Sequence, residues 1–137
     1  FLASIIARIY IAKIFFSAGL TKIQDWDTTL FLFEEEYQVP LISFELAAIL
    51  GTAGELVLPI MLLFGLLTRF SALGLFVVNF VAVISLAEIA PAALYLHYLW
   101  GLLLAQILIY GAGPLSLDTL ARSLSLKAQH KARLIPQ

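Results

Sequence analysis

The sequence predicts an all-α fold: a four-helix transmembrane bundle with a short interfacial helix after the first span and an amphipathic helix at the C-terminal end. Composition is the first reason, because 62% of the 137 residues are apolar, only 12% are charged and the mean hydropathy is +1.01. Globular domains are about 45–50% apolar and about 25% charged, so a soluble domain of this length could not cover so much apolar surface. The second reason is that the apolar residues form four runs of the roughly 20 residues that a helix needs to cross a bilayer.

The four runs define one membrane domain over residues 1–137. Lys22 closes the first run, and Gly65 provides a helix stop for the second. The turn "GLLTRF" leads to the third run, and Pro91, which suits the first turn of a helix, begins the fourth, which ends at the breaker "GAGP". The predicted spans are residues 2–21, 44–64, 70–89 and 91–110.

The charges between the spans predict the orientation of the chain. Acidic residues gather in the connection after the first span and around Glu88, whereas Arg69 and the basic C-terminal segment lie on the other side. By the positive-inside rule both termini are cytoplasmic, and a bacterial inner membrane is the expected location. Lys22 is the one cation on the opposite side, at a helix end where its ammonium group can reach the interface.

The stretch "DWDTTLFLFEEEY" predicts the interfacial helix. Trp26, Leu30, Phe33 and Tyr37 recur at the spacing of one helix face, and Asp27 is a suitable N-cap. We expect this helix to lie on the membrane surface with its glutamates facing water.

The stretch "PLSLDTLARSLSLK" predicts an amphipathic helix over residues 116–128, with Ser116 as its cap. Leucines form its apolar side, and Arg122 and Lys127 can meet anionic lipid head groups. In the alternative interpretation, this segment and the interfacial one only extend the neighbouring helices.

Every predicted span contributes a polar side chain at or inward of mid-depth. These residues form a candidate intramembrane cluster of Glu55, Arg8, Lys13, Asn79 and Gln106. An acid at a helix centre costs about 2.5–3.5 kcal/mol, so Glu55 is expected to have a partner. Depth favours Lys13, whereas helix face and the fork geometry of guanidinium favour Arg8, which is the partner we expect.

Two roles fit this cluster. It can lock the four helices in register as a buried ion pair with amides, or Glu55 can take up protons or hold the polar head of a ligand. His97, near Trp100 in the fourth span, also has alternative roles: it belongs to an interfacial aromatic belt, or it contacts a quinone carbonyl or joins a metal site with the outer carboxylates. The run "EEE" at residues 34–36 is typical of a solvated face, and we predict no metal site.

Several functions lack the residues they need. Without cysteine the chain itself can form no disulfide, thiol nucleophile or iron–sulfur cluster. No nucleophile–base pair, metal triad or cofactor fingerprint can be placed, so we do not expect an independent enzyme or a cofactor bound within the chain. Phosphate-binding glycine motifs and basic–aromatic interleaving are absent too, so nucleic acid is not an expected partner.

Three stretches of the sequence form a combined pattern. The first is Arg8, Phe15, Gly19, Lys22 in the first span, and the second is Glu55 followed by "LLFGLLTR". The third is "GAGPLSLD", which ends at Asp118. Together they resemble the DoxX family of small four-helix membrane proteins, many of which share a Gly-x-Gly-x-x-Ser-x-Asp ending close to the third stretch. The resemblance covers nearly the whole chain in the right order.

The resemblance implies a role beside redox enzymes. The family takes its name from a subunit linked to a quinone-coupled oxidase system, and other members resemble partners of membrane oxidoreductases or act in oxidative stress. Our first hypothesis is therefore a non-catalytic anchor or accessory subunit of a quinone-linked redox assembly. The alternative is a homo-oligomeric carrier or channel for protons, a metal ion or a small metabolite, with Glu55 as its coupling site.

Overall fold

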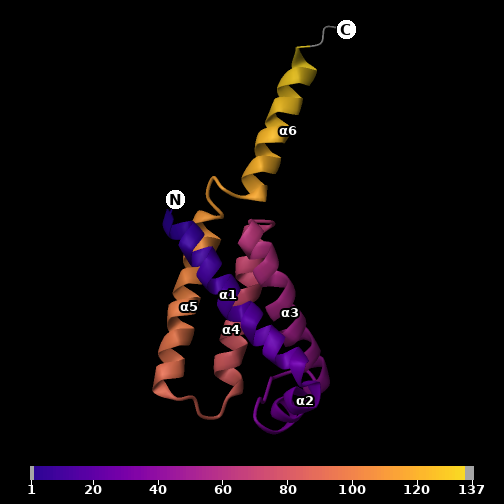
Figure 1. Ribbon diagram of the computed structural model, residues 1–137, viewed down its shortest axis with the longest axis vertical. Coiled ribbons are helices and arrows are strands. Elements are labelled where there is room, and N and C mark those ends of the chain that lie inside the picture. The colour runs from indigo at the N-terminus through magenta and orange to yellow at the C-terminus, as the bar shows by residue number, and fades with distance from the viewer. Residues whose placement is uncertain (1, 135–137) are drawn as a thin grey trace.

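A computed structural model describes residues 2–134, which form six α-helices (Figure 1). Four of these helices are long and apolar enough to cross a membrane, and no strand is present in the described residues, so the predicted all-α bundle is confirmed. The helices are α1 (Leu2–Gln24), α2 (Trp26–Glu35), α3 (Phe44–Phe64), α4 (Thr68–Ser85), α5 (Pro91–Tyr110) and α6 (Leu117–Arg133).

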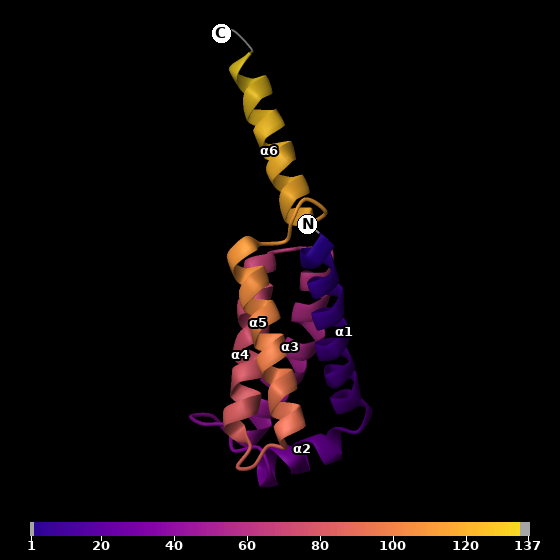
Figure 2. The same ribbon diagram turned by 90° about the vertical axis from the view of Figure 1, so that its left-hand side faces the viewer.

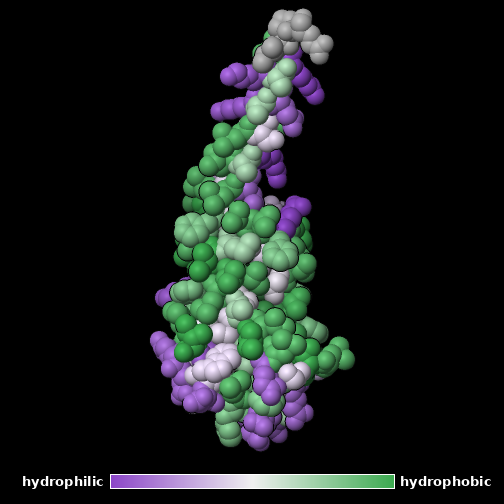
Figure 3. All heavy atoms as spheres, turned by 90° about the vertical axis from the view of Figure 1, so that its right-hand side faces the viewer, coloured by the Kyte–Doolittle hydropathy of each residue, from purple (hydrophilic) through white to green (hydrophobic). Residues whose placement is uncertain are grey.

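The four long helices stand side by side, and α2 lies across one end of them (Figure 2). α1 packs against α3 and α5, and α4 packs against the same two helices, so the four close into a ring. We call the end that holds α2 the α2 end, and the opposite end, where α6 projects from the bundle, the α6 end (Figure 1). On the face that Figure 3 shows, the surface of the bundle above the polar α2 end is mostly apolar, as expected for a surface that faces lipid.

The centre of the ring is a small apolar core. Ile11, Leu62, Leu75, Leu104 and Ile107 are almost completely buried there. Alanines complete the core and let the helix backbones approach closely, which matters because lipid tails provide no hydrophobic drive between helices. Many other large apolar side chains are exposed on the outside of the bundle.

The third span differs from its prediction at both ends. We predicted residues 70–89, but α4 covers Thr68–Ser85. It ends early because Leu86 is extended and forms an isolated β-bridge with Tyr37, while the N–H of Gln38 donates to the carbonyl of Ser85. The connection after α2 thus takes over the end of α4, an interaction that hydropathy could not indicate.

The interfacial segment is a separate helix, so the alternative in which it only extends its neighbours is wrong for this segment. Its N-cap is Asp25 and not Asp27, because the Asp25 carboxylate accepts a hydrogen bond of 3.0 Å from the N–H of Thr28. The predicted apolar face does pack as a unit: Phe33 is buried against Ala47 and Ala48 of α3. The same alternative fails for α6, which is capped by Ser116 as predicted and runs further, to Arg133.

Arg8 joins the helices at the α6 end. The residue is 3% exposed, and its guanidinium donates to the carbonyls of Leu62 (2.9 Å) and Leu63 (2.6 Å), in the last turn of α3. It also donates to the carbonyls of Ala112 and Leu115, both at 2.9 Å, in the connection between α5 and α6. Carbonyls in the last turn of a helix lack the helical N–H donor that earlier carbonyls have. The Leu62 carbonyl also accepts the N–H of Gly65 at 3.1 Å, and Arg8 supplies a further donor to it and a donor to the Leu63 carbonyl.

Gly65 makes room for this contact. It ends α3 with a φ of +67°, a left-handed conformation that glycine adopts without strain. A Cβ at this position would lie 2.8 Å from the Arg8 guanidinium and would collide with Ser116. A glycine is therefore required both by the turn and by the close approach of the α5–α6 connection.

Asp118 caps a helix that has no cap of its own. Leu67 stands at the N-cap of α4 with a φ of +45° and offers no capping side chain. The carboxylate of Asp118 accepts the N–H groups of Leu67 and Thr68, both at 2.8 Å, and the N–H of Asp118 donates to the carbonyl of Gly65 at 2.9 Å. Carboxylates are favourable at helix N-termini. Asp118 therefore attaches the first turn of α6 to the start of α4.

We predict that Arg8→Lys strongly destabilises the bundle. A lysine cannot reach four carbonyls from one position, and a buried carbonyl that is left without any partner costs about 1–3 kcal/mol. The free energy of unfolding, measured by denaturant titration in detergent micelles, should fall by about 3 kcal/mol or more. Arg69→Lys is the matched control, because Arg69 is exposed and makes one hydrogen bond of 3.1 Å to Ile109; equal effects of the two substitutions would contradict the role of Arg8.

We predict that the direction of α6 depends on pH through Asp118. Burial raises the pKa of this carboxyl, but the contacts with Thr68 and Leu67 and the charge of Arg122 outweigh it, so the pKa lies below its ordinary value. The cap is therefore complete above the ordinary pKa of about 3.9 and is lost as the pH falls through the lower, folded-state value.

The absence of cysteine makes this measurable with two spin labels. In a Phe64→Cys, Ser125→Cys double variant, the distribution of label–label distances should be narrow at neutral pH and should broaden at low pH. With Asp118→Asn added it should be broad at every pH. A narrow distribution in that variant at neutral pH would show that Asp118 does not hold α6.

Candidate ligand-binding site

Glu55, at the middle of α3, pairs with Lys22 near the end of α1. The Lys22 Nζ donates to the Glu55 Oε2 at 2.6 Å, and the side chains are 22% and 12% exposed respectively. It is the one ion pair within residues 2–134. The carboxylate is the more buried partner, so it depends on the lysine more than the lysine depends on it.

Two local features bring the pair together. Gly19 lies one turn before Lys22, and a Cβ there would come within 2.9 Å of the Leu56 side chain and 3.1 Å of the Glu55 backbone. Only glycine allows α1 and α3 to approach so closely at this level. The Thr29 hydroxyl then donates to the carbonyl of Lys22 at 2.8 Å, which fixes the start of α2 against the end of α1.

This pairing corrects our expectation that Arg8, or otherwise Lys13, would hold Glu55. Arg8 is occupied by carbonyls at the α6 end, and Lys13 is exposed on the outside of α1. Asn79 binds His97, and Gln106 makes no side-chain hydrogen bond with any described residue. The five predicted cluster residues therefore do not meet at one place.

Asn79 fixes the tautomer of the His97 ring. The Asn79 Nδ2 donates to the His97 carbonyl at 2.9 Å, so its Oδ1 faces the His97 Nδ1 at 2.8 Å. Because an amide oxygen only accepts hydrogen bonds, Nδ1 must carry the proton. In the neutral ring, Nε2 then keeps a free lone pair that can accept a hydrogen bond.

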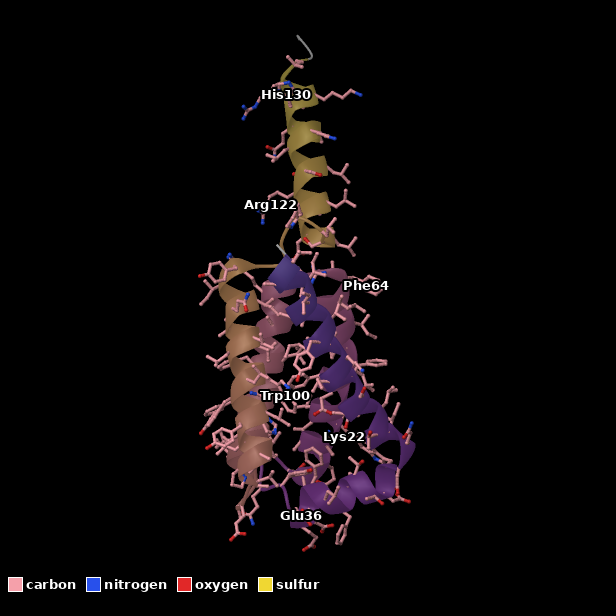
Figure 4. All side chains as sticks on the ribbon, turned by 60° about the vertical axis from the view of Figure 1, so that its left-hand side comes forward. Lys22, Glu36, Phe64, Trp100, Arg122 and His130 are labelled. Carbon is pink, nitrogen blue, oxygen red and sulfur yellow. The ribbon has the colours of Figure 1, made fainter. Side chains whose placement is uncertain are left out.

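A cavity of about 620 Å³ lies between the helices in the half of the bundle nearer α2. Lys22 and Glu55 line it from α1 and α3, and His97 and Trp100 line it from α5. The rest of the wall is mainly aliphatic. Figure 4 shows Lys22 and Trp100 at neighbouring levels of the bundle, between Phe64 at the α6 end and Glu36 at the α2 end.

Aromatic contacts hold the wall on the α5 side. The Trp100 ring packs edge-on against Phe15 at 5.9 Å and against His97 at 4.9 Å, and its Nε1 donates to the Tyr10 hydroxyl at 3.3 Å. Tyr37 lines the cavity from the connection after α2, where burial, followed by the charges of Glu36 and Glu55, raises the pKa of its phenol. The phenol therefore stays neutral at ordinary pH.

The cavity also borders the outer surface of the bundle. Leu50 on α3 and Val77 on α4 line it, although they are 55% and 51% exposed. The wall between α3 and α4 is thus shared with the surface that faces lipid. Lined by aliphatic groups with an ion pair and a histidine on facing helices, the cavity suits an amphiphilic ring with a few polar atoms and an apolar tail.

The fold and this cavity define a small polytopic helical membrane protein. Comparison with known proteins then identifies it further: the DoxX family model matches residues 3–88, and the chain belongs to the DoxX family. It is 32% identical to an uncharacterized protein of Haemophilus influenzae, over 86% of this chain and 82% of the relative. No solved structure matches the chain.

We predict unequal effects when each partner of the ion pair is removed. Lys22→Met leaves a buried carboxylate unpaired and should lower the free energy of unfolding by about 3–5 kcal/mol. Glu55→Gln leaves a more exposed lysine and should cost clearly less, about 1 kcal/mol. The double variant should recover most of the loss caused by Lys22→Met.

Denaturant titration of the purified chain measures all three variants. Lys13→Met serves as the control, because Lys13 lies in the same helix and makes no ion pair with a described residue. If the effects of the two single substitutions simply add in the double variant, the two side chains are not coupled.

Proposed function

We propose that this protein is a non-catalytic subunit of a membrane redox assembly and that it holds a quinone-like ring in the cavity between its helices, with the α6 end in the cytoplasm of a bacterial inner membrane. The observation that carries the proposal is the pairing of polar groups with an apolar wall: Lys22 and Glu55 face the cavity from one side, and His97 faces it from another. The volume of about 620 Å³ lies within the range of about 300–1,000 Å³ typical of ligand pockets.

The polar groups match the oxygens of a quinone. A quinone carbonyl accepts a hydrogen bond, and the Lys22 ammonium has donors beyond the one used for Glu55. A quinol hydroxyl donates, and the free His97 Nε2 accepts in the neutral ring. The same site can therefore contact the oxidised form through Lys22 and the reduced form through His97.

The apolar tail of such a ligand also has a place to go. Leu50 and Val77 belong both to the cavity wall and to the outer surface, so a tail can lie between α3 and α4 and continue into lipid. This would favour lipid-dissolved ligands over water-soluble ones, because the entry side is aliphatic.

Electron transfer itself would belong to a partner subunit. Within residues 2–134, no three side chains of the metal-binding types cluster, and the chain lacks cysteine for iron–sulfur ligation. A quinone held in this cavity could exchange electrons only with a centre on another protein. This is why we propose a subunit that positions the ligand and not an independent oxidoreductase.

The carrier alternative has less support in this fold. The half of the bundle nearer α6 is filled by the apolar core and by Arg8 with its carbonyl partners, so within residues 2–134 the polar groups around Glu55 do not continue to the α6 end. A carrier built from several copies would have to form its route between chains. Ion flux into liposomes that disappears with Glu55→Gln would favour that alternative.

We predict saturable binding of a short-chain benzoquinone such as ubiquinone-1. In a Trp26→Phe background, Trp100 is the only tryptophan, and it lines the cavity, so its fluorescence should be quenched with a Kd in the micromolar range. Ala82→Phe, which fills the cavity, and His97→Leu should each weaken binding at least tenfold, which corresponds to about 1.4 kcal/mol.

Leu102→Phe is the matched control, because Leu102 is 71% exposed on the outer face of α5. It should bind like the parent, and thermal unfolding should show that all variants remain folded. Quenching that does not saturate, or a Kd that Ala82→Phe leaves unchanged, would mean that the quinone only partitions into the micelle, and the proposal would fail.

A further inference from the structure

Lys13 is a charged group in the one place of the bundle where a charge is least tolerated. It is the central residue of α1, eleven residues from Leu2 and eleven from Gln24, which places it roughly 16 Å along the helix from either end. Contacts with α5 give the same level, because Tyr10 and Phe15, on either side of Lys13, both contact Trp100 at the middle of α5. Lysines near helix ends can extend to the interface, but a central lysine is too far from it to do so fully.

Its side chain lies on the outside of the bundle. The buried face of α1 carries Ala12 and Phe15, whereas Ile9 and Lys13 are exposed to the surroundings. No hydrogen bond or ion pair links Lys13 to any residue between Leu2 and Leu134. The bundle thus leaves this cation unsatisfied on a surface that faces lipid.

The polar surface continues along the same helix. Ser17 and Thr21 follow Lys13 at four-residue intervals and are exposed as well, so the three side chains form a polar strip along the outer face of α1. The Thr21 hydroxyl donates to the carbonyl of Ser17, but the Ser17 hydroxyl makes no bond within the described chain. Small hydroxyl residues are common where transmembrane helices pack against each other.

We propose that this strip of Lys13, Ser17 and Thr21 is the docking face for a transmembrane helix of a different protein, one that presents an Asp or Glu at mid-depth. A buried ammonium in lipid is stabilised by a carboxylate, so charge complementarity selects the partner. The proposal does not depend on a quinone in the cavity, and shares with the proposed function only the expectation of a heteromeric assembly.

A second copy of this chain cannot supply that carboxylate. Within the four long helices the acidic residues are Glu45 and Glu55. Glu45 lies in the first turn of α3, far from mid-depth, and Glu55 is 9% exposed and already bound to Lys22. A symmetric contact through α1 would instead bring two Lys13 cations together, which is unfavourable.

Lipid head groups also cannot supply the counter-charge, because they lie at a different depth from Lys13. Phosphates lie at the ends of the spans, roughly a dozen residues away along the helix, whereas Lys13 lies at the centre. The proposed partner helix solves this problem because its carboxylate can sit at the same depth. The hydroxyls of Ser17 and Thr21 would then lie along the rest of the contact.

Photocrosslinking in the native membrane tests the proposal. The full chain carries p-benzoylphenylalanine at position 17, next to Lys13 on the strip, or, as the matched control, at position 102 on the outer face of α5. We expect position 17, and not position 102, to form an adduct with one other protein, and the adduct to map to a transmembrane helix with an Asp or Glu at mid-depth. Lys13→Leu should reduce the adduct at least tenfold.

A charge exchange completes the test. Lys13→Asp should abolish the adduct, and replacement of the mapped partner acid by lysine should restore it. Adducts only with a second copy of this chain, adducts only with lipid, or a heterologous adduct that Lys13→Leu leaves unchanged would each overturn the proposal.

Two further measurements separate this proposal from others. The purified Lys13→Leu chain should unfold at the same or a higher temperature than the parent; a lower temperature would show that Lys13 acts within the chain, and would overturn the proposal. Lys13→Leu should also leave benzoquinone binding unchanged, and His97→Leu should leave the crosslink unchanged, so the two proposals can fail independently.

Discussion

The bundle depends on one buried guanidinium. Arg8 binds the last carbonyls of α3 and the carbonyls of the α5–α6 connection, so one nearly buried side chain joins α1 to the end of α3 and to that connection. A helix end buried in an apolar medium needs such partners, and a guanidinium supplies several donors from one residue. The left-handed turn at Gly65 and the cap that Asp118 gives to α4 both lie against this contact.

The positions that resemble the DoxX pattern separate into two groups with different physical roles. Arg8 and Asp118 belong to the α6 end, where backbone groups are bound and the helix order is fixed. Gly19, Lys22 and Glu55 belong to the level of the cavity, where a glycine lets two helices approach so that an ion pair can form. The first group holds the α6 end together, whereas Lys22 and Glu55 of the second group line the cavity, so a change in ligand need not disturb the α6 end.

The sequence predicted the helices better than the contacts between them. Hydropathy located all four spans, and Ser116 was correctly assigned as the cap of α6, because these signals are local in the chain. The partner of Glu55 was missed because depth was counted from helix ends as if the helices were parallel to the membrane normal. α1 crosses α3 instead, so that Lys22, near the end of one helix, meets the middle of the other. The stripe of Arg8, Gly19 and Lys22 along α1 was the available signal.

Three cations on α1 show how far a sequence alone can assign roles inside a membrane. Arg8 is satisfied by backbone carbonyls, Lys22 by a carboxylate, and Lys13 by nothing in the described chain. All three pose the same problem of charge in an apolar medium, and only the packing around each decides the answer. Where packing within the chain solves it, the residue contributes to the fold or to the cavity. Where packing leaves the charge on the outside, as for Lys13, we propose that another molecule supplies the counter-charge. The depth of the charged residue then indicates what kind of molecule that is.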